Sequence, residues 1–185
     1  MQGADKLLEL IDDKPLLHHA ASAAHASAAD QVIVVLPDMN HLRAQALQGL
    51  KIELCAAPNH TEGMAGSLRD GLAQLPFDCD AVIIALADMP DVTARHYNAL
   101  IAAFDPAIGH EICRATSDGG QPGHPVLFSR RFFQSLAGLT GDTGARSLIA
   151  SAAAFLVDVP TPGQGALVDL DTVQEWQKWR ALNRR

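Results

Sequence analysis

The chain has 185 residues, of which 48% are hydrophobic and 19% are charged, and its formal net charge is −7. This length suits one domain with a sizeable buried core, so we expect residues 1–185 to form a single domain. The acidic balance argues against a nucleic-acid binder, which normally presents a basic face. It leaves nucleotides open as ligands, because Mg²⁺ can neutralise phosphates beside carboxylates.

Neither a run of 18 apolar residues nor a signal-peptide pattern occurs, so we expect no membrane span and no export. The three cysteines, Cys55, Cys79 and Cys113, are far apart and odd in number. This pattern fits reduced structural thiols rather than a disulfide framework or a metal pair. Together these features predict a cytoplasmic protein.

Apolar runs alternate with helical patterns along the chain. The apolar runs predict strands over 31–36, 51–57, 80–90, 154–160 and 165–171. Helical spacing and start signals, including N-caps at Thr93 and Thr143, predict helices over 15–29, 40–48, 64–75, 93–104, 130–138, 143–153 and 171–182. The alternation predicts an α/β fold with a mainly parallel sheet. The segment 105–128, rich in Gly, Pro and Asp, interrupts it and predicts an insertion or a β-excursion.

The stretch "ALADMP" (85–90) carries the strongest chemical signal, because ligands of open parallel sheets bind beyond the carboxyl ends of the strands. An apolar run delivers Asp88 to the tip of the strand expected over 80–90. An aspartate there can hold a hard cation. The alternative is a turn or helix N-cap aspartate.

The stretch "VDLDT" (168–172) carries a second pair of carboxylates. Strand alternation would put Asp169 and Asp171 on one face, where they repel unless a cation lies near them. The alternative is that Asp171 caps the last helix, and both roles are compatible.

Three turn-rich stretches add weaker signals. In "PNHTEGMAGSLRDGL" (58–72), Gly63 and Gly66 permit close backbone approach at a strand-to-helix junction, and Ser67 could hydrogen-bond a base or a phosphate. In "GGQPGHPVLF" (119–128), His124 is placed to face a ligand, and in "TGDTGARSL" (140–148), Arg146 could grip an anionic group. Turn residues at this density can also be simple punctuation.

Taken together, these stretches resemble the molybdenum-cofactor nucleotidyltransferase family, and within it the molybdopterin cytidylyltransferase type. The matching motifs occur in the family's order, from Lys6 to Trp176: "KLLEL…DKPLL", "PNHTEGMAGSLRDGL", "LADMP", "GHPVLF", "GDTGAR" and "VDLDTVQEW". The resemblance implies a Rossmann-like, three-layer α/β/α fold of the nucleotide-diphospho-sugar transferase type.

The resemblance also assigns roles to residues. Lys6 and Asp88 would be catalytic, and Asp88 would bind Mg²⁺ with Asp169 or Asp171 as a second ligand. The residues that would contact the nucleotide are Lys6, Asn59, Gly63, Met64, Ser67 and Arg69. The residues that would contact the acceptor are His124, Asp142 and Arg146.

The family carries a strand and a glycine-rich phosphate loop before the position that Lys6 matches. Here Met1 and Gly3 fall on the tail of that loop, so we expect a chain truncated at its N-terminus by a misplaced start or by trimming. Loss of a central strand would expose two unpaired edges, a liability that proteins normally avoid.

The expected activity is transfer of a nucleoside monophosphate, CMP from CTP, onto a phosphorylated acceptor such as molybdopterin, with Mg²⁺ as cofactor and pyrophosphate as product. Molybdoenzyme maturation proteins are possible partners, and neither nucleic acid nor membrane is expected. The alternatives are a methylerythritol phosphate cytidylyltransferase, a guanylyltransferase of the same fold that uses GTP, and a non-catalytic nucleotide-binding protein.

Overall fold

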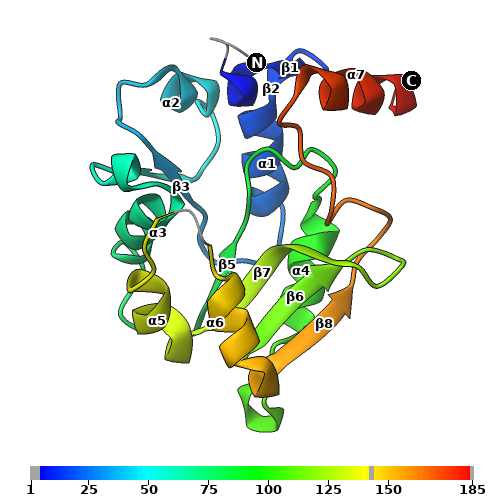
Figure 1. The fold of residues 1–185 in the computed structure, drawn as a ribbon. Coiled ribbons are helices and arrows are strands. Elements are labelled where there is room, and N and C mark those ends of the chain that lie inside the picture. Colours follow the sequence, from blue (N-terminus) through cyan, green and yellow to red (C-terminus); the bar gives the residue numbers. More distant parts are fainter. Residues whose placement is uncertain (1–4, 142–143, 184–185) are drawn as a thin grey trace.

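A computed structural model of the protein describes residues 5–141 and 144–183 (Figure 1). The α-helices are α1 (Leu16–His25), α2 (Leu42–Ala46), α3 (Met64–Leu72), α4 (Ala94–Ala103), α5 (Phe133–Ala137), α6 (Arg146–Ser151) and α7 (Val173–Leu182). The strands are β1 (Leu10–Ile11), β2 (Lys14–Pro15), β3 (Ile33–Leu36), β4 (Glu53–Ala56), β5 (Ala81–Ile84), β6 (Ile112–Thr116), β7 (Pro122–Ser129) and β8 (Leu156–Pro160). Every helix expected from the sequence has a counterpart, although each is shorter than its pattern.

The larger sheet has the strand order β5-β7-β6-β8, and β3 pairs with β4 in a separate two-stranded sheet. The pairs β3–β4 and β6–β8 are parallel, whereas β7 runs antiparallel to both β5 and β6. The α/β class is therefore confirmed, but the larger sheet is mixed rather than mainly parallel. The sheet is mixed because the segment 105–128 contributes most of an antiparallel β6–β7 hairpin, and β7 pairs with β5. The β-excursion expected from the sequence is therefore confirmed.

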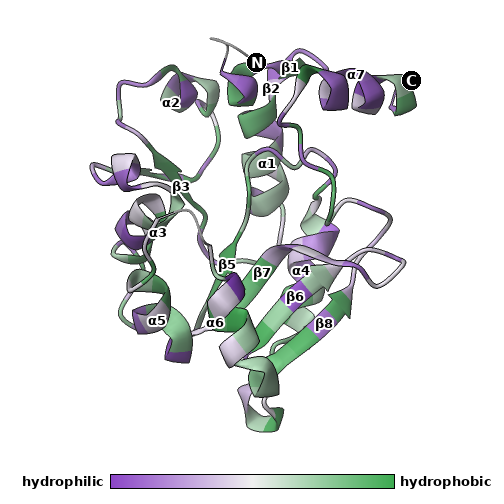
Figure 2. Ribbon diagram, in the orientation of Figure 1, coloured by the Kyte–Doolittle hydropathy of each residue, from purple (hydrophilic) through white to green (hydrophobic). Residues whose placement is uncertain are grey.

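Helices cover both faces of the larger sheet, which gives three layers (Figure 1). Alternate residues of β6 and β7 explain this, because Ile112, Val126 and Phe128 pack with the helical segments around α5 and α6. Their neighbours Cys113, Ala115 and Leu127 pack on the other face against Leu100 of α4. Apolar residues dominate the sheet strands, and polar residues are concentrated on outlying helices and loops (Figure 2). This two-sided burial is typical of a sheet with helices on both faces.

A further apolar cluster joins the two ends of the described chain. Leu16 of α1, Leu170 and Trp176 of α7 are buried together, with Leu7 packed against them. Leu7 also packs against a second cluster, which contains Leu36 at the end of β3. The N-terminal segment therefore lies beside α7, as Figure 1 shows.

Two predicted strands differ from the structure. The strand expected over 80–90 ends at Ile84, so Asp88 lies in the loop beyond it. The strand expected over 165–171 does not form. Its backbone instead makes isolated hydrogen bonds, including His124 N–H of β7 to the Ala166 carbonyl at 2.9 Å and Leu170 N–H to the carbonyl of Asp88, in the loop after β5, at 3.1 Å. These single bonds do not form the continuous ladder of a strand pair.

β3 and β5 are not paired with each other among the described residues, since they belong to different sheets. Their carboxyl ends nevertheless converge, because Leu36 of β3 and Ala87 of the loop after β5 pack in one cluster. This places the loop that carries Asp88 at the carboxyl edge of both sheets. The helices described here include none with the length and apolar character needed to cross a bilayer.

Candidate active site

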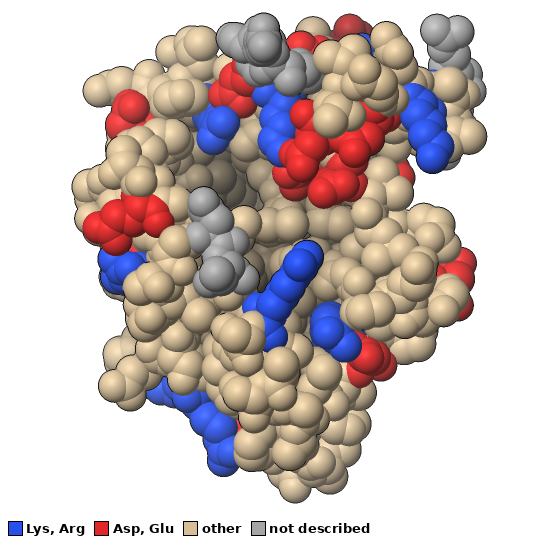
Figure 3. Space-filling view, viewed as in Figure 1, with Lys and Arg blue, Asp and Glu red and all other residues tan. Residues whose placement is uncertain are grey.

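Three charged residues from distant parts of the chain meet at this edge. The Nζ of Lys6 donates to Asp88 Oδ2 at 2.6 Å and also to Asp171 Oδ1, although the two aspartates lie 82 and 165 positions away. Acidic side chains accordingly gather on the face below α7, beside a recess in the surface (Figure 3). Burial lowers the pKa of Lys6, but the hydrogen bonds that its ammonium donates to Asp171 and Asp88 outweigh this effect, and the net pKa shift is upward. Lys6 is therefore a charged ammonium shared by two carboxylates.

The loop after β5 presents Asp88 from a fixed backbone. Its neighbour Met89 is buried, and the Asp88 carbonyl accepts from Leu170 N–H at 3.1 Å. One carboxylate oxygen, Oδ1, is buried without a hydrogen-bond partner among the described residues. A buried acceptor without a donor is costly unless a ligand completes it. The turn alternative for Asp88 does not account for this oxygen.

The other two aspartates flank Leu170. Asp171 is not the cap of α7, because Thr172 takes that position and accepts from Glu175 N–H. Burial, followed by the carboxylates of Asp171 and Asp88, raises the pKa of Asp169. The negative charges of Asp171 and Asp88 therefore act on Asp169, and the concentration of negative charge at these three carboxylates favours binding of a cation. Within 5–141 and 144–183, however, three or more His, Cys, Asp or Glu side chains nowhere form a ready-made metal cluster.

His124 lies at the same edge, two residues before Val126, which pairs with Ile84 at the end of β5. Burial lowers the pKa of His124, a hydrogen bond with the Ile84 backbone opposes this, and Arg146 lowers it further. The imidazole is therefore held neutral, and its Nδ1 is buried without a partner among the described residues. Gly123 permits the local backbone path, because a Cβ there would collide with the Ala166 carbonyl oxygen.

The turn before α3 follows the carboxyl end of β4, as predicted. Gly63 has a positive φ of 84°, and a Cβ at Gly66 would collide with the Asn59 carbonyl. The Asn59 side chain donates to Asp70 Oδ1 at 2.7 Å, and Asp70 Oδ2 accepts from Asn59 N–H at 3.0 Å. Asp70 thus fixes the turn, a role that the sequence did not indicate.

The other residues expected to contact the nucleotide, Arg69, Met64 and Ser67, differ in exposure and in their contacts. Arg69 pairs with Glu62 at 3.0 Å and donates to the Ala137 carbonyl at 3.3 Å, so its guanidinium braces α3 against the end of α5. Met64 is about half exposed at the start of α3, and Ser67 is partly buried one turn later. Their contact with a nucleotide stays a prediction.

Of the residues expected to contact the acceptor, the structure describes His124 and Arg146 but not Asp142. Arg146 is exposed at the first position of α6 and is close enough to His124 to lower its pKa. Asp142, like Thr143, lies outside the described residues. Ala65 N–H donates to the Gly141 carbonyl at 3.2 Å, so Gly141 lies against the start of α3.

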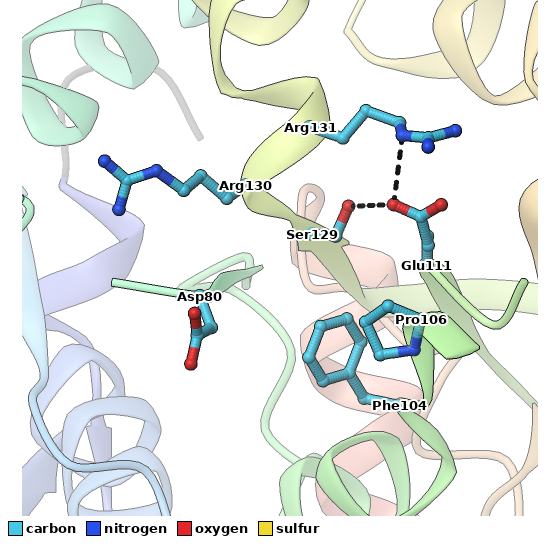
Figure 4. A pocket seen from close by; sticks show the side chains of 7 residues that line it. All are labelled: Asp80, Phe104, Pro106, Glu111, Ser129, Arg130 and Arg131. Atoms are coloured by element: carbon cyan, nitrogen blue, oxygen red, sulfur yellow. Dashed lines mark hydrogen bonds and ion pairs between the residues drawn. The ribbon is translucent and has the colours of Figure 1, made fainter. Parts of the chain in front are cut away.

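A hollow of about 450 Å³ lies at the opposite edge of the sheet (Figure 4). Asp80, before β5, and Ser129, at the end of β7, line it with Glu111 and Arg131. The buried Glu111 carboxylate accepts from Ser129 Oγ at 2.8 Å and pairs with Arg131 at 3.3 Å (Figure 4). Its charge is thus compensated within the protein, and it lies at the amino end of β5, away from Asp88.

Two contacts around the site were missed by sequence reasoning. The Trp179 indole donates to Asp91 Oδ1 at 3.0 Å, which ties α7 to the loop that carries Asp88. Arg43 donates to both carboxylate oxygens of Asp5, beside Lys6. No local signal could have found either contact, because the partners are 88 and 38 positions apart.

Comparisons with known proteins place the chain among nucleotidyltransferase-like proteins. The sequence pattern of the MobA-like NTP transferase domain family matches residues 1–157. Purine catabolism protein PucB of Bacillus subtilis (strain 168) is 31% identical over 123 residues, which are 64% of this chain and 57% of PucB. The match thus spans little more than half of that relative.

Solved structures share the fold over almost the whole chain. Rv0371c from Mycobacterium tuberculosis H37Rv superposes with a TM-score of 0.81 at 25% identity, covering 96% of this chain and 89% of Rv0371c. Its complex with manganese gives 0.79 at 26% identity, with 94% and 89% covered. A CMP:2-keto-3-deoxy-manno-octonic acid synthetase in complex with CTP, at 16% identity, shares the fold with a TM-score of 0.75, covering 96% of this chain and 90% of that one. Because this sequence pattern covers residues 1–157 and the fold is shared with these solved structures, the chain belongs to the family of MobA-like NTP transferase domains.

Proposed function

We propose that the protein is a nucleotidyltransferase that moves a nucleoside monophosphate from a nucleoside triphosphate to a phosphorylated acceptor. The observation that carries this proposal is the Lys6 ammonium shared by Asp88 and Asp171 at the carboxyl edge of the sheets. Family membership and the likeness to PucB and Rv0371c support it. In this proposal CTP is the donor and molybdopterin is the acceptor.

The reaction demands positioning and charge neutralisation more than acid–base chemistry. An acceptor phosphate oxygen attacks the α-phosphorus of the triphosphate and forms the new P–O bond. The bond from that phosphorus to the oxygen that bridges to the β-phosphate breaks, and pyrophosphate leaves with the electron pair. A phosphate monoester is already largely ionised at pH 7, so the chain needs no general base.

Lys6 is the residue we assign to the triphosphate. Its ammonium would exchange a carboxylate partner for phosphate oxygens when the nucleotide binds. Because it sits on an ordered helical turn, the charge is positioned before the reaction begins. Asn59, Gly63, Met64, Ser67 and Arg69 are assigned to the nucleotide from the resemblance.

The carboxylates fit a divalent cation. Asp88 offers a buried oxygen without a partner among the described residues, and Asp171 and Asp169 add the oxygen ligands that Mg²⁺ prefers. We therefore assign Mg²⁺ to Asp88 with Asp169 or Asp171, and the manganese complex of Rv0371c supports a divalent ion in such a chain. When bound, the cation would neutralise charge on the phosphates.

His124 and Arg146 are assigned to the acceptor. The neutral imidazole of His124 can donate or accept a hydrogen bond without adding charge. Arg146 is an exposed cation near it and suits the acceptor phosphate. We extend this role to Asp142 from the resemblance, and we propose maturation proteins of molybdoenzymes as partners.

Replacement of the central carboxylate tests the proposal. We expect Asp88→Asn to lower the rate of pyrophosphate release from CTP and acceptor by about 100-fold or more, because it removes a charge that the reaction requires. Asp80→Asn, at the other end of the same strand, is the matched control and should keep the wild-type rate. Equal rates for the wild type and Asp88→Asn would remove Asp88 from the mechanism.

The choice of substrates is tested separately. Calorimetric titration with CTP and with GTP, each with Mg²⁺, measures base preference, and the rate assay with molybdopterin and methylerythritol phosphate measures the acceptor. Tighter binding of CTP and turnover of molybdopterin are expected. Nucleotide binding without turnover of either acceptor would favour the non-catalytic alternative.

A further inference from the structure

Lys6 belongs to a three-residue helical turn that is too short to be stable without contacts to other parts of the chain. The residues Lys6–Leu8 form a single 3₁₀ turn, named η1. Such a short helix gains little from its own hydrogen bonds, because nucleation fixes several dihedral angles for one bond. The position of the ammonium therefore depends on what anchors η1.

Asp5 is the first anchor. It is the N-cap of η1, and its Oδ1 accepts from Leu7 N–H at 3.1 Å. The Leu8 N–H donates to the Asp5 carbonyl at 2.9 Å. An N-cap aspartate satisfies backbone donors that a helix start leaves open. The orientation of Asp5 therefore sets the orientation of the turn that carries Lys6.

Arg43 of α2 fixes Asp5 in turn. Its Nε donates to Oδ2 at 2.7 Å and its Nη2 donates to Oδ1 at 3.0 Å, so the contact is bidentate. The two side chains are only 28% and 21% exposed. A bidentate guanidinium–carboxylate pair restricts orientation as well as distance, which a single-contact surface pair does not.

The charge on Asp5 is consistent with this clamp. Burial raises the pKa of Asp5, but the hydrogen bonds from Arg43 and from the Leu7 backbone outweigh it, so that the pKa is lowered below 3.8. Asp5 is therefore ionised at neutral pH, and its ion pair with Arg43 persists there. The Arg43 backbone is fixed as well, because its N–H donates to the His41 side chain at 3.2 Å.

We infer that Arg43 is a positioning residue for Lys6, acting through the bidentate contact with Asp5. The inference rests on the proposed function, in which Lys6 contacts the triphosphate. Because α2 follows β3 in the chain, the Arg43–Asp5 contact connects the segment after β3 to the Lys6 ammonium. Arg43 need not touch the nucleotide itself.

A double-mutant cycle measures this coupling. Calorimetry with CTP and Mg²⁺ would give the Kd of the wild type, Arg43→Ala, Lys6→Ala and the double variant. Loss of the outer partner of a metal ligand typically costs about 10–100-fold in affinity or activity, and by analogy we expect Arg43→Ala to raise the Kd for CTP by about tenfold. In the Lys6→Ala background the same change should add nothing, because there is no ammonium left to position. A full additional loss in that background would overturn the inference.

Arg114→Ala is the matched control. Arg114 of β6 makes the same kind of bidentate contact with Asp158 of β8, at 2.8 Å and 3.0 Å. It should leave the Kd for CTP at the wild-type value. An equal increase for Arg114→Ala and Arg43→Ala would mean that the loss is general destabilisation, and it would overturn the positioning role.

Hydrogen exchange gives a readout without nucleotide. We expect Arg43→Ala and Asp5→Asn to speed exchange at the Leu7 and Leu8 amides about tenfold, with exchange in β6 and β7 unchanged. Unchanged exchange at these two amides would overturn the inference even if the Kd rises. A wild-type protein without affinity for CTP or GTP would refute the proposed function, while the exchange experiment would still decide whether Arg43 orders the turn.

Discussion

His96 shows how a single buried residue makes stability depend on pH. It is only 2% exposed, and its Nδ1 accepts from Thr93 N–H at 3.2 Å as part of the capping box of α4. An imidazole nitrogen that accepts cannot carry a proton, and burial lowers the pKa of His96 below its usual value of 6.5. The folded protein therefore holds His96 neutral.

We expect the free energy of unfolding to fall as the pH decreases below 6.5. The unfolded state takes up the proton first, so it binds more protons than the folded state until the pH reaches the lowered pKa of His96. Well above 6.5 the residue is neutral in both states and adds no pH dependence. Urea unfolding between pH 5 and pH 8 measures the slope, which His96→Gln should reduce. Identical slopes for the wild type and His96→Gln would contradict this account.

At the scale of elements, α7 holds the C-terminal part of the site. Thr172 caps it and accepts from Glu175 N–H at 3.2 Å, while the Glu175 carboxylate accepts from the N–H groups of Thr172 at 2.7 Å and Asp171 at 2.9 Å. The indole of Trp179 then reaches Asp91. The start of α7 thus fixes the backbone beside Asp171, and its last turns reach the loop of Asp88.

Thr172→Ala should lower the free energy of unfolding by about 1 kcal/mol, because it leaves a backbone donor at the start of α7 without its cap. The measurement is urea unfolding at pH 7. Gln174→Ala, an exposed change in the same helix, is the control and should stay within about 0.5 kcal/mol of the wild type. Equal stability of the two variants would show that the capping box contributes little.

At the scale of the whole molecule, the site joins three regions of the chain. Lys6 comes from the N-terminal part, Asp88 from the middle and Asp171 from the C-terminal part. A ligand held by all three binds the folded chain and has no equivalent site in the unfolded one. Nucleotide binding should therefore stabilise the entire fold.

We expect CTP with Mg²⁺, at 100 times its Kd, to raise the free energy of unfolding by about 2.7 kcal/mol. Urea unfolding with and without nucleotide measures the increase. Lys6→Ala, at the same nucleotide concentration, should gain clearly less. A wild-type protein that binds CTP by calorimetry but gains no stability would show that the nucleotide binds the unfolded chain equally well.

Much of the local structure could be predicted from the sequence. The alternation of apolar runs and helical patterns predicted the α/β class, and Thr93 was correctly expected as an N-cap. The strand predicted over 165–171 was wrong, although its apolar alternation is real, because the segment makes isolated backbone hydrogen bonds to His124 and Asp88 instead of a strand ladder. Periodicity reports which side chains are buried, but it cannot report whether a partner strand is present.

The sequence by itself determined which chemistry the chain carries: the aspartates that follow an apolar run, the glycines of the turns, and the motifs of a nucleotidyltransferase family. Only the tertiary structure decided that β7 runs antiparallel beside β5, that Lys6 bridges Asp88 and Asp171, and that Arg43 clamps Asp5. The physical reason is the separation in sequence between the residues that interact. Burial and capping act between residues a few positions apart, whereas ion pairs over 38 to 165 positions exist only after packing has brought their elements together.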